Sequence, residues 1–331
     1  MSFSRFLHYQ AQLQLMPVLE SGEEPTLVGG QAVLEGVMMR APHSYCVAVR
    51  KPDGQIVCEE QPVGRMSEKY PIFKYPVFRG LGTLGQAMQL GFKALNFSTA
   101  ALLEEELTQD AIKSGKPLVD GKAPEAPKWM TILNVVFAVG FFLVMYKVIP
   151  LLIAERLGTS RLSINIWDGV IRLVILMSFL TLLSKMKDMR RMFEYHGAEH
   201  KVVFNFESGK PVTIENAQKF VTFHPRCGTS FLLVMMVIAM MTYMFLPLDG
   251  FWEKLAARIV LLPVIIGMSY ELIRFAAKRQ GTMMGLLTAP GLWLQRVTTK
   301  PPDDAQTEIA IRALEQAMEL EAKQGGQLVI A

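Results

Sequence analysis

Long uncharged stretches restrict this 331-residue chain more than any other feature of its sequence. Residues 129–146 and 228–248 contain no Asp, Glu, Lys or Arg. A helix of about 20 such residues crosses the hydrocarbon core of a bilayer. Two more stretches, 164–184 and 256–277, reach that length if the charged residues within them are accommodated. The sequence therefore predicts an α-helical integral membrane protein with about four transmembrane helices.

The overall composition agrees with this class. Apolar residues make up 51% of the chain, charged residues only 19%, and the mean hydropathy is +0.27. The lipid bilayer is therefore the expected partner. The net charge of +4 is small and dispersed, so no nucleic-acid partner is expected. Cys46, Cys58 and Cys227 do not form a disulfide framework, and we expect them to be reduced.

Basic residues predict the orientation in the membrane. The loop at 185–227 is rich in Lys and Arg, whereas the loops near 155–163 and 249–258 contain fewer. Loops with an excess of Lys and Arg face the cytoplasm. We therefore expect a multi-pass protein whose two termini and central loop are cytoplasmic.

The remaining sequence divides into segments around the predicted spans. "SYCVAVR" and "QIVCEEQ" flank "KPDG", a turn signal, and predict a β-hairpin. Apolar residues spaced three or four apart predict a helix after this hairpin. The predicted segments are a loosely ordered N-terminus (1–25), a small β-rich cytoplasmic domain (26–70), an amphipathic or interfacial helix (71–107), a linker (108–128), the membrane domain (129–277) and a cytoplasmic tail with an amphipathic helix (278–331).

The string "EYHGAEHK" indicates metal chemistry. His196 and His200 are four residues apart, so on a helix both imidazoles lie on one face. H-x-x-E-H is the inverted zincin pattern, in which Glu199 would be the general base. Zinc is therefore the most plausible of the divalent metals. The competing interpretation is a polar helix whose histidines lie at the membrane interface.

Further ligand types are predicted to lie at the same membrane face. His224 and Cys227 occur in "FHPRCGTSF", directly before the third span, and Glu271 lies near the cytoplasmic end of the fourth. Imidazole, thiolate and carboxylate all bind zinc. Simpler interpretations are a His-Pro turn, a small apolar cysteine and a salt bridge of Glu271 with Arg274. Asp168, in the second span, lies toward the opposite face and is expected to be structural.

Several strings resemble a bacterial membrane protein family. "GGQAVLEGVMMRAP", "YHGAEHK", "HPRCGTSF", "SYELIRF" and "PGLWLQRVTT" are similar to the YqhQ-type proteins, the family called DUF1385, over about residues 28–320. The resemblance implies a predicted metal-dependent enzyme in the bacterial cytoplasmic (inner) membrane, and it implies no substrate. It also directs attention to Gln31, Glu35 and Arg40 in the first string. This string is either a buried strand with a turn or a segment that folds over the site and contacts a ligand.

The function expected from these features is a membrane-embedded, zinc-dependent enzyme, hydrolytic, with its site at the cytoplasmic face. In this case the metal keeps an open position. A closed shell would instead indicate a membrane scaffold or biogenesis factor with a structural metal. Such a factor would contact a cytoplasmic protein partner through the β domain or the C-terminal helix. A small transporter is a third alternative, because charged residues lie within the spans.

Overall fold

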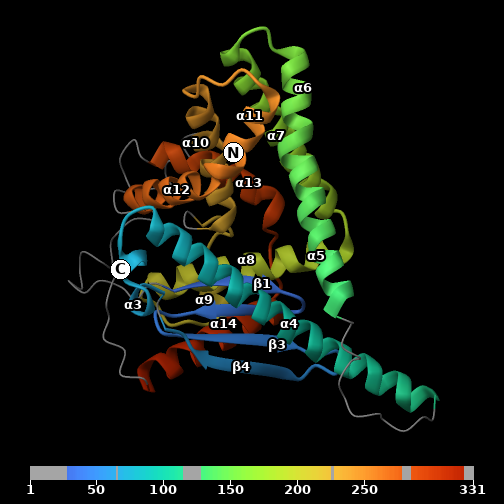
Figure 1. Cartoon of the computed structure of the whole chain (residues 1–331). Coiled ribbons are helices and arrows are strands. Elements are labelled where there is room, and N and C mark those ends of the chain that lie inside the picture. The colour runs from blue at the N-terminus through green and yellow to red at the C-terminus, as the bar shows by residue number, and fades with distance from the viewer. Residues whose placement is uncertain (1–27, 65, 115–127, 225–226, 278–284, 324–331) are drawn as a thin grey trace.

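The computed structural model describes residues 28–64, 66–114, 128–224, 227–277 and 285–323. Within these ranges the protein is mostly helical, with one small antiparallel sheet near the N-terminus (Figure 1). The predicted N-terminal segment and most of the predicted linker lie outside the described residues.

Four strands form the sheet as a simple meander. They are β1 (Gly29–Val33), β2 (Gly36–Arg40), β3 (Ser44–Arg50) and β4 (Ile56–Pro62), in the spatial order β1-β2-β3-β4 with every pair antiparallel. The predicted "KPDG" hairpin joins β3 to β4, and Gly54 has a φ of 88° there. This left-handed conformation is open to glycine at no steric cost, which explains why the turn ends in Gly.

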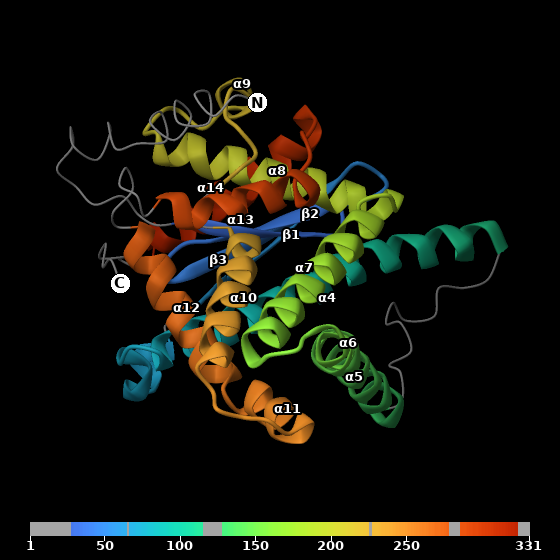
Figure 2. The ribbon, with the colours of Figure 1, turned by 90° about the horizontal axis from the view of Figure 1, so that it is seen from above.

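Helices cover both faces of this sheet (Figure 2). On one face, Val37 and Cys46 pack against α8 (Lys187–Glu207) and α14 (Asp304–Lys323). On the other face, Met38 and Val47 pack against α4 (Phe78–Ser114). Consecutive strand residues point to opposite faces, so a strand buried on both sides needs apolar residues at every position. The four strands therefore form the middle layer of a three-layer α/β unit.

The C-terminal helix is a core element of this unit. Its apolar side chains pack on the sheet and on α8 and are fully buried or nearly so, among them Ile309, Leu314 and Ala317. The hydroxyl of Ser44 on β3 donates to the carbonyl of Ala317 at 2.7 Å. The apolar face of the predicted amphipathic tail is therefore occupied within the chain.

The apolar helices lie together on the side of α8 that faces away from the sheet (Figure 1). They are α5 (Lys128–Leu143), the π-helical turn η2 (Val144–Val148), α6 (Ile149–Leu157), α7 (Arg161–Leu183), α10 (Gly228–Met244), α11 (Phe251–Val260) and α12 (Leu262–Ala277). Residues 136–157 and 161–183 are each long and apolar enough to span a membrane. The pair α11 and α12 passes the same test but is bent by 50°, and α10 is shorter. The structure thus supports two or three of the four predicted spans.

The surface of these helices is apolar and their interior contains charges. Phe137 is 72% exposed and Val260 is 72% exposed, whereas Asp168 is 3% exposed. A water-soluble helical bundle shows the opposite arrangement. This distribution is consistent with a membrane location.

One side of α4 also exposes apolar residues. Met88, Phe92 and Leu95 recur at helical spacing and are exposed, whereas Leu90 and Ala94 face the sheet. The helix continues to Ser114, seven residues into the predicted linker. Four further elements complete the described chain: α3 (Met66–Lys69), η1 (Pro71–Lys74), α9 (Ile214–Gln218) and α13 (Gly285–Thr298).

Candidate metal centre

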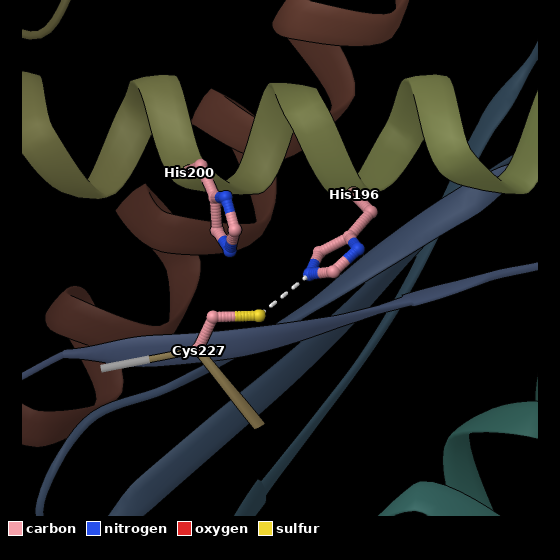
Figure 3. Close-up of side chains that lie close together, drawn as sticks. All are labelled: His196, His200 and Cys227. Atoms are coloured by element: carbon pink, nitrogen blue, oxygen red, sulfur yellow. Dashed lines mark hydrogen bonds between the residues drawn. The ribbon is translucent and has the colours of Figure 1, made fainter. Parts of the chain in front are cut away.

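Two histidines and one cysteine face one another where α8 meets the start of α10 (Figure 3). His196 and His200 project from successive turns of α8, with ring centroids 4.5 Å apart. Cys227, the N-cap residue of α10, places its Sγ 3.3 Å from Nε2 of His196. One ligand atom from each of the three residues lies within 4.8 Å of the other two. The four-residue spacing of the histidines therefore places both imidazoles on one side of the helix, as the sequence predicted.

Backbone carbonyls fix which ring nitrogen of each histidine is available. Nδ1 of His196 lies 2.8 Å from the carbonyl oxygen of Thr298, and Nδ1 of His200 lies 2.5 Å from that of Thr222. A carbonyl oxygen only accepts hydrogen bonds, so Nδ1 must carry the proton in both rings. The lone pair is then on Nε2, the atom that faces Cys227. Metal-binding histidines usually have this arrangement, with the distal N–H donated to a carbonyl or carboxylate.

Burial keeps His200 in the form that binds metals. The side chain is 2% exposed, and burial is the main reason why its pKa falls to about 4. The neighbouring His196 and His224 lower this pKa further, whereas Cys227 acts in the opposite direction. Imidazole is therefore neutral at pH 7, as ligation requires.

Glu199, the residue before His200 on α8, places its carboxylate beside the His200 ring. Its Oε2 lies 3.4 Å from Nε2 of His200, and the residue is 6% exposed. Two atoms each about 2.1 Å from one tetrahedral zinc ion stand roughly 3.4 Å apart. The carboxylate is thus beside the ligand atom of His200, and it lies outside the group that His196, His200 and Cys227 form.

Strand β1 passes directly over Glu199. A Cβ atom added to Gly30 would lie 2.7 Å from Cγ of Glu199 and 2.6 Å from the carbonyl oxygen of Met38. Only glycine permits so close an approach. The "GGQAV" segment therefore contacts the site through its backbone.

The polar side chains predicted from that segment lie elsewhere. Gln31 and Arg40 are on the face of the sheet that packs against α4, and Arg40 donates to Gln86 at 2.8 Å. Glu35 accepts hydrogen bonds from Arg191 and from the hydroxyl of Tyr195. None of these three side chains reaches the His/Cys cluster. The segment forms a strand and a turn, and it approaches the site only through its backbone.

His224 lies beside the cluster without joining it. Its ring centroid is 5.5 Å from that of His200, and its Nε2 lies 3.6 Å from the carboxylate of Glu207. Burial lowers the pKa of His224 to about 4, which leaves this ring neutral too.

Gln295 holds the backbone around His224 in place. The amide oxygen of Gln295 accepts from the backbone N–H of His224 at 2.7 Å. Its amide nitrogen donates to the carbonyl of His224 and to the hydroxyl of Ser230. Because Cys227 lies between His224 and Ser230, this clamp also positions the thiol. Two residues of the predicted "HPRC" turn, 225 and 226, lie outside the described residues.

The structure does not bring Glu271 to the cluster. Both carboxylate oxygens bond to the guanidinium of Arg79, at 3.1 and 2.5 Å. Helix α12 packs on α4, and this contact pairs Glu271 with an arginine distant in sequence. The predicted salt bridge with Arg274 is replaced by this pair.

Sequence reasoning missed the role of Gly197 in "HGAEH". A Cβ at Gly197 would lie 2.0 Å from the carbonyl oxygen of Lys300, so the segment after α13 runs directly against α8. The backbone N–H of Lys300 donates to the carbonyl of Phe193 at 2.9 Å. This close approach brings the Thr298 carbonyl to His196. A glycine between two helical histidines was the available signal, because glycine inside a helix usually has a packing reason.

Comparisons with known proteins agree with the predicted family. Residues 75–320 match the family model described as "Protein of unknown function (DUF1385)". The chain is also 33% identical over 308 residues to the "Uncharacterized protein YqhQ" of Bacillus subtilis (strain 168), an alignment that covers 90% of this chain and 94% of that protein. No solved structure matches the chain. Neither description names a metal or an activity. The chain belongs to the DUF1385 family of proteins of unknown function.

Proposed function

We propose that this protein is a membrane-embedded, metal-dependent hydrolase whose site faces the cytoplasm. His196, His200 and Cys227 would hold a divalent ion, with zinc as the preferred metal. The observation that carries the proposal is the pair of imidazoles whose Nδ1 atoms are bound by carbonyls and whose Nε2 atoms face one thiol.

The donor set fits zinc and leaves room for chemistry. Two imidazole nitrogens and a thiolate suit a borderline-soft ion that prefers four ligands. Three protein ligands leave one coordination position open, as in catalytic zinc sites. A bound ion would supply Lewis acidity. The carboxylate of Glu199 would accept a proton from the water that attacks the substrate, and the carbonyls of Thr222 and Thr298 would keep both rings oriented.

A structural site is the second candidate, and two observations favour it. His224 is buried with its ring centroid 5.5 Å from that of His200, and Oε2 of Glu199 lies 3.4 Å from Nε2 of His200. If either side chain became the fourth ligand, the shell would be closed and the ion would only hold α8 against α10. The protein would then be a membrane scaffold with a cytoplasmic partner.

The proposed orientation follows from charge. Among the described residues, the segment that contains α8 and α9 has more Lys and Arg than the connections at the far ends of α6 and α10. We therefore place the sheet, the metal centre and both termini in the cytoplasm, and we count α10 as a fourth span. An impermeant thiol reagent applied to intact cells should label a cysteine introduced at Asp249 and spare one at Lys210. The reverse labelling would overturn this orientation.

Metal content tests the site directly. Protein purified without chelators should contain about one transition metal ion per chain. His196→Ala and Cys227→Ser should each lose it, because both side chains serve one ion. His43→Ala is the matched control, since His43 pairs with Glu321 on another part of the unit and should retain the ion. Wild-type protein without a stoichiometric metal would end the proposal.

Glu199→Gln separates the enzyme from the scaffold. For a general base, the variant should keep its ion but fail to complement a deletion strain, because losing such a base costs about 10²–10⁴ in rate. Loss of the ion would identify Glu199 as a ligand of a closed, structural shell. Full complementation with the ion retained would also refute the enzyme. Glu194→Gln, on the same helix and hydrogen-bonded to Gln306, is the control and should behave as wild type.

A further inference from the structure

A second cluster of charged side chains lies inside the apolar helices, apart from the metal centre. Its members are Lys147, Asp168, Arg172 and Arg258, each between 2% and 6% exposed. Arg172 donates to Oδ1 of Asp168 at 3.0 Å, and Arg258 donates to Oδ2 at 3.2 Å. The predicted Asp168–Arg172 pair is therefore present, and one carboxylate serves two guanidinium groups.

The cluster has too few negative charges. Three cations share one carboxylate, which leaves an excess of two positive charges. Within the described part of the chain, the ammonium of Lys147 makes no hydrogen bond or ion pair, and its charged neighbours are only the other three members. Nε of Arg172 is also buried without a hydrogen-bond partner among the described residues. Uncompensated buried charge is costly, so a cluster of this kind is a candidate site for a ligand of opposite charge.

Lys147 lies near the middle of its candidate span, whereas Asp168 is seven residues after the start of α7 and Tyr243 is next to the end of α10. Lys147 is 11 residues from the start and 10 from the end of the 136–157 helix. It belongs to the π-helical turn η2, a rare irregularity that is frequently found at functional sites. Tyr243, which packs under Arg258 with 4.9 Å from guanidinium to ring, is 16 residues along α10 from Cys227. At 1.5 Å per residue the two ends of this helix are roughly 24 Å apart, so the cluster is separate from the metal centre.

A cavity adjoins these charges. It is small, with an enclosed volume of about 30 Å³. Its polar lining consists of Tyr146, Lys147, Asp168, Arg172 and Tyr243, and its apolar lining includes methionines of α10. Ligand cavities generally combine an apolar wall with a few convergent polar groups in this way.

We propose that this cavity binds an anion through a phosphate group. The guanidinium group of arginine and the ammonium group of lysine are the side-chain groups that most often recognise phosphate. Lys147, Arg172 and Asp168 line the cavity with a net charge of one, and a phosphate group brings one negative charge as a phosphodiester and up to about two as free phosphate near pH 7. The phosphate group is either the headgroup of an anionic phospholipid or free phosphate.

Two binding measurements on the full-length protein distinguish the sources. In a neutral detergent, inorganic phosphate is compared with chloride at equal ionic strength. In nanodiscs, phosphatidylglycerol is compared with phosphatidylcholine. The melting temperature is recorded in each case, and native mass spectrometry counts retained phosphatidylglycerol. We expect one of the two phosphate sources to raise the melting temperature of the wild-type protein.

Lys147→Met should have two effects that together identify the site. It removes an unpaired buried charge, so in neutral detergent without phosphate the variant should melt at or above the wild-type temperature. Its affinity for the effective anion should fall at least about tenfold, the equivalent of roughly 1.4 kcal/mol. Lys185→Met, at an exposed position beyond the end of α7, is the matched control and should respond as wild type.

The proposal fails if neither phosphate source raises the melting temperature of the wild-type protein. It also fails if Lys147→Met and Lys185→Met respond equally to the anion. A Lys147→Met protein that melts below wild type without phosphate would show that the ammonium is already compensated, and would overturn the argument from charge.

Discussion

Replacing Gly197 with alanine tests the contact that builds the metal centre. A real Cβ atom essentially never approaches another heavy atom to under 3.0 Å, and here the carbonyl oxygen of Lys300 would be at 2.0 Å. The backbone after α13 must therefore retreat by about 1 Å. Such a shift would take the Thr298 carbonyl, now 2.8 Å from Nδ1 of His196, out of hydrogen-bond range.

The expected change in stability is a difference between opposing effects. Alanine is favoured over glycine inside a helix by about 1 kcal/mol. Overpacking costs typically about 1–3 kcal/mol, and losing the bond from Lys300 to Phe193 costs roughly 1 kcal/mol more. Gly197→Ala should therefore be destabilising by about 1–3 kcal/mol. Metal affinity should fall by about 10- to 100-fold, as is typical when the second hydrogen bond of a ligating histidine is lost.

Gly85→Ala provides the matched control. Gly85 is also inside a helix, but a Cβ there would meet nothing within 4 Å. Helix propensity then acts alone, and this variant should be stabilised by up to about 1 kcal/mol. The assay is thermal unfolding in detergent, followed by metal titration of each apoprotein. If Gly197→Ala unfolds at or above the wild-type temperature, as Gly85→Ala should, the reasoning from close approach is refuted.

Two further predictions concern the supports of the site and of the sheet. Gln295→Leu should destabilise the protein by roughly 2–4 kcal/mol, because the backbone N–H and carbonyl of His224 lose buried hydrogen-bond partners. An unchanged unfolding temperature would show that Gln295 does not hold the His224 backbone in place. Burial tends to raise the pKa of Glu321, but hydrogen bonds from the side chain and backbone of His43 outweigh it and hold this pKa below 4.5. A lowered folded pKa contributes stability above the unfolded value, and this stability is lost as the pH falls. Glu321→Gln should therefore be destabilising at pH 7, with a difference from wild type that shrinks as the pH falls below about 4.5 and disappears below the folded pKa of Glu321. The control Glu315→Gln, at an exposed position, should show no such dependence.

Features set by local sequence could be predicted. The hairpin at "KPDG" follows from turn chemistry, and the common face of His196 and His200 follows from helical periodicity. The apolar runs likewise predict helices, and the family resemblance rests on long strings. All of these depend on residues close to one another in the chain.

Features set by packing between distant elements could not be predicted. The prediction that Glu271 lies at the metal site was wrong. The contact of α12 with α4 pairs Glu271 with Arg79, and no local sequence pattern indicates this contact. The carbonyls of Thr222 and Thr298 are backbone atoms, so side-chain identity does not reveal them. Cys227, by contrast, was predicted correctly as a neighbour of the helix histidines, because it directly precedes a long apolar helix. Whether these residues hold an ion stays a prediction.

The packing of α14 on the sheet has a consequence for how the protein is made. Between the end of β4 at Pro62 and the start of α14 at Asp304 lie more than two hundred residues, including every candidate span. At a synthesis rate of about 5–20 residues per second, roughly 10–50 s pass between the synthesis of β4 and the synthesis of α14, the helix that covers the sheet. Throughout this time the apolar side of β2 and β3 lacks its C-terminal cover while the membrane helices are being inserted. The sheet can be completed only after insertion ends, so any ribosome stalled before α14 leaves an aggregation-prone surface attached to the membrane.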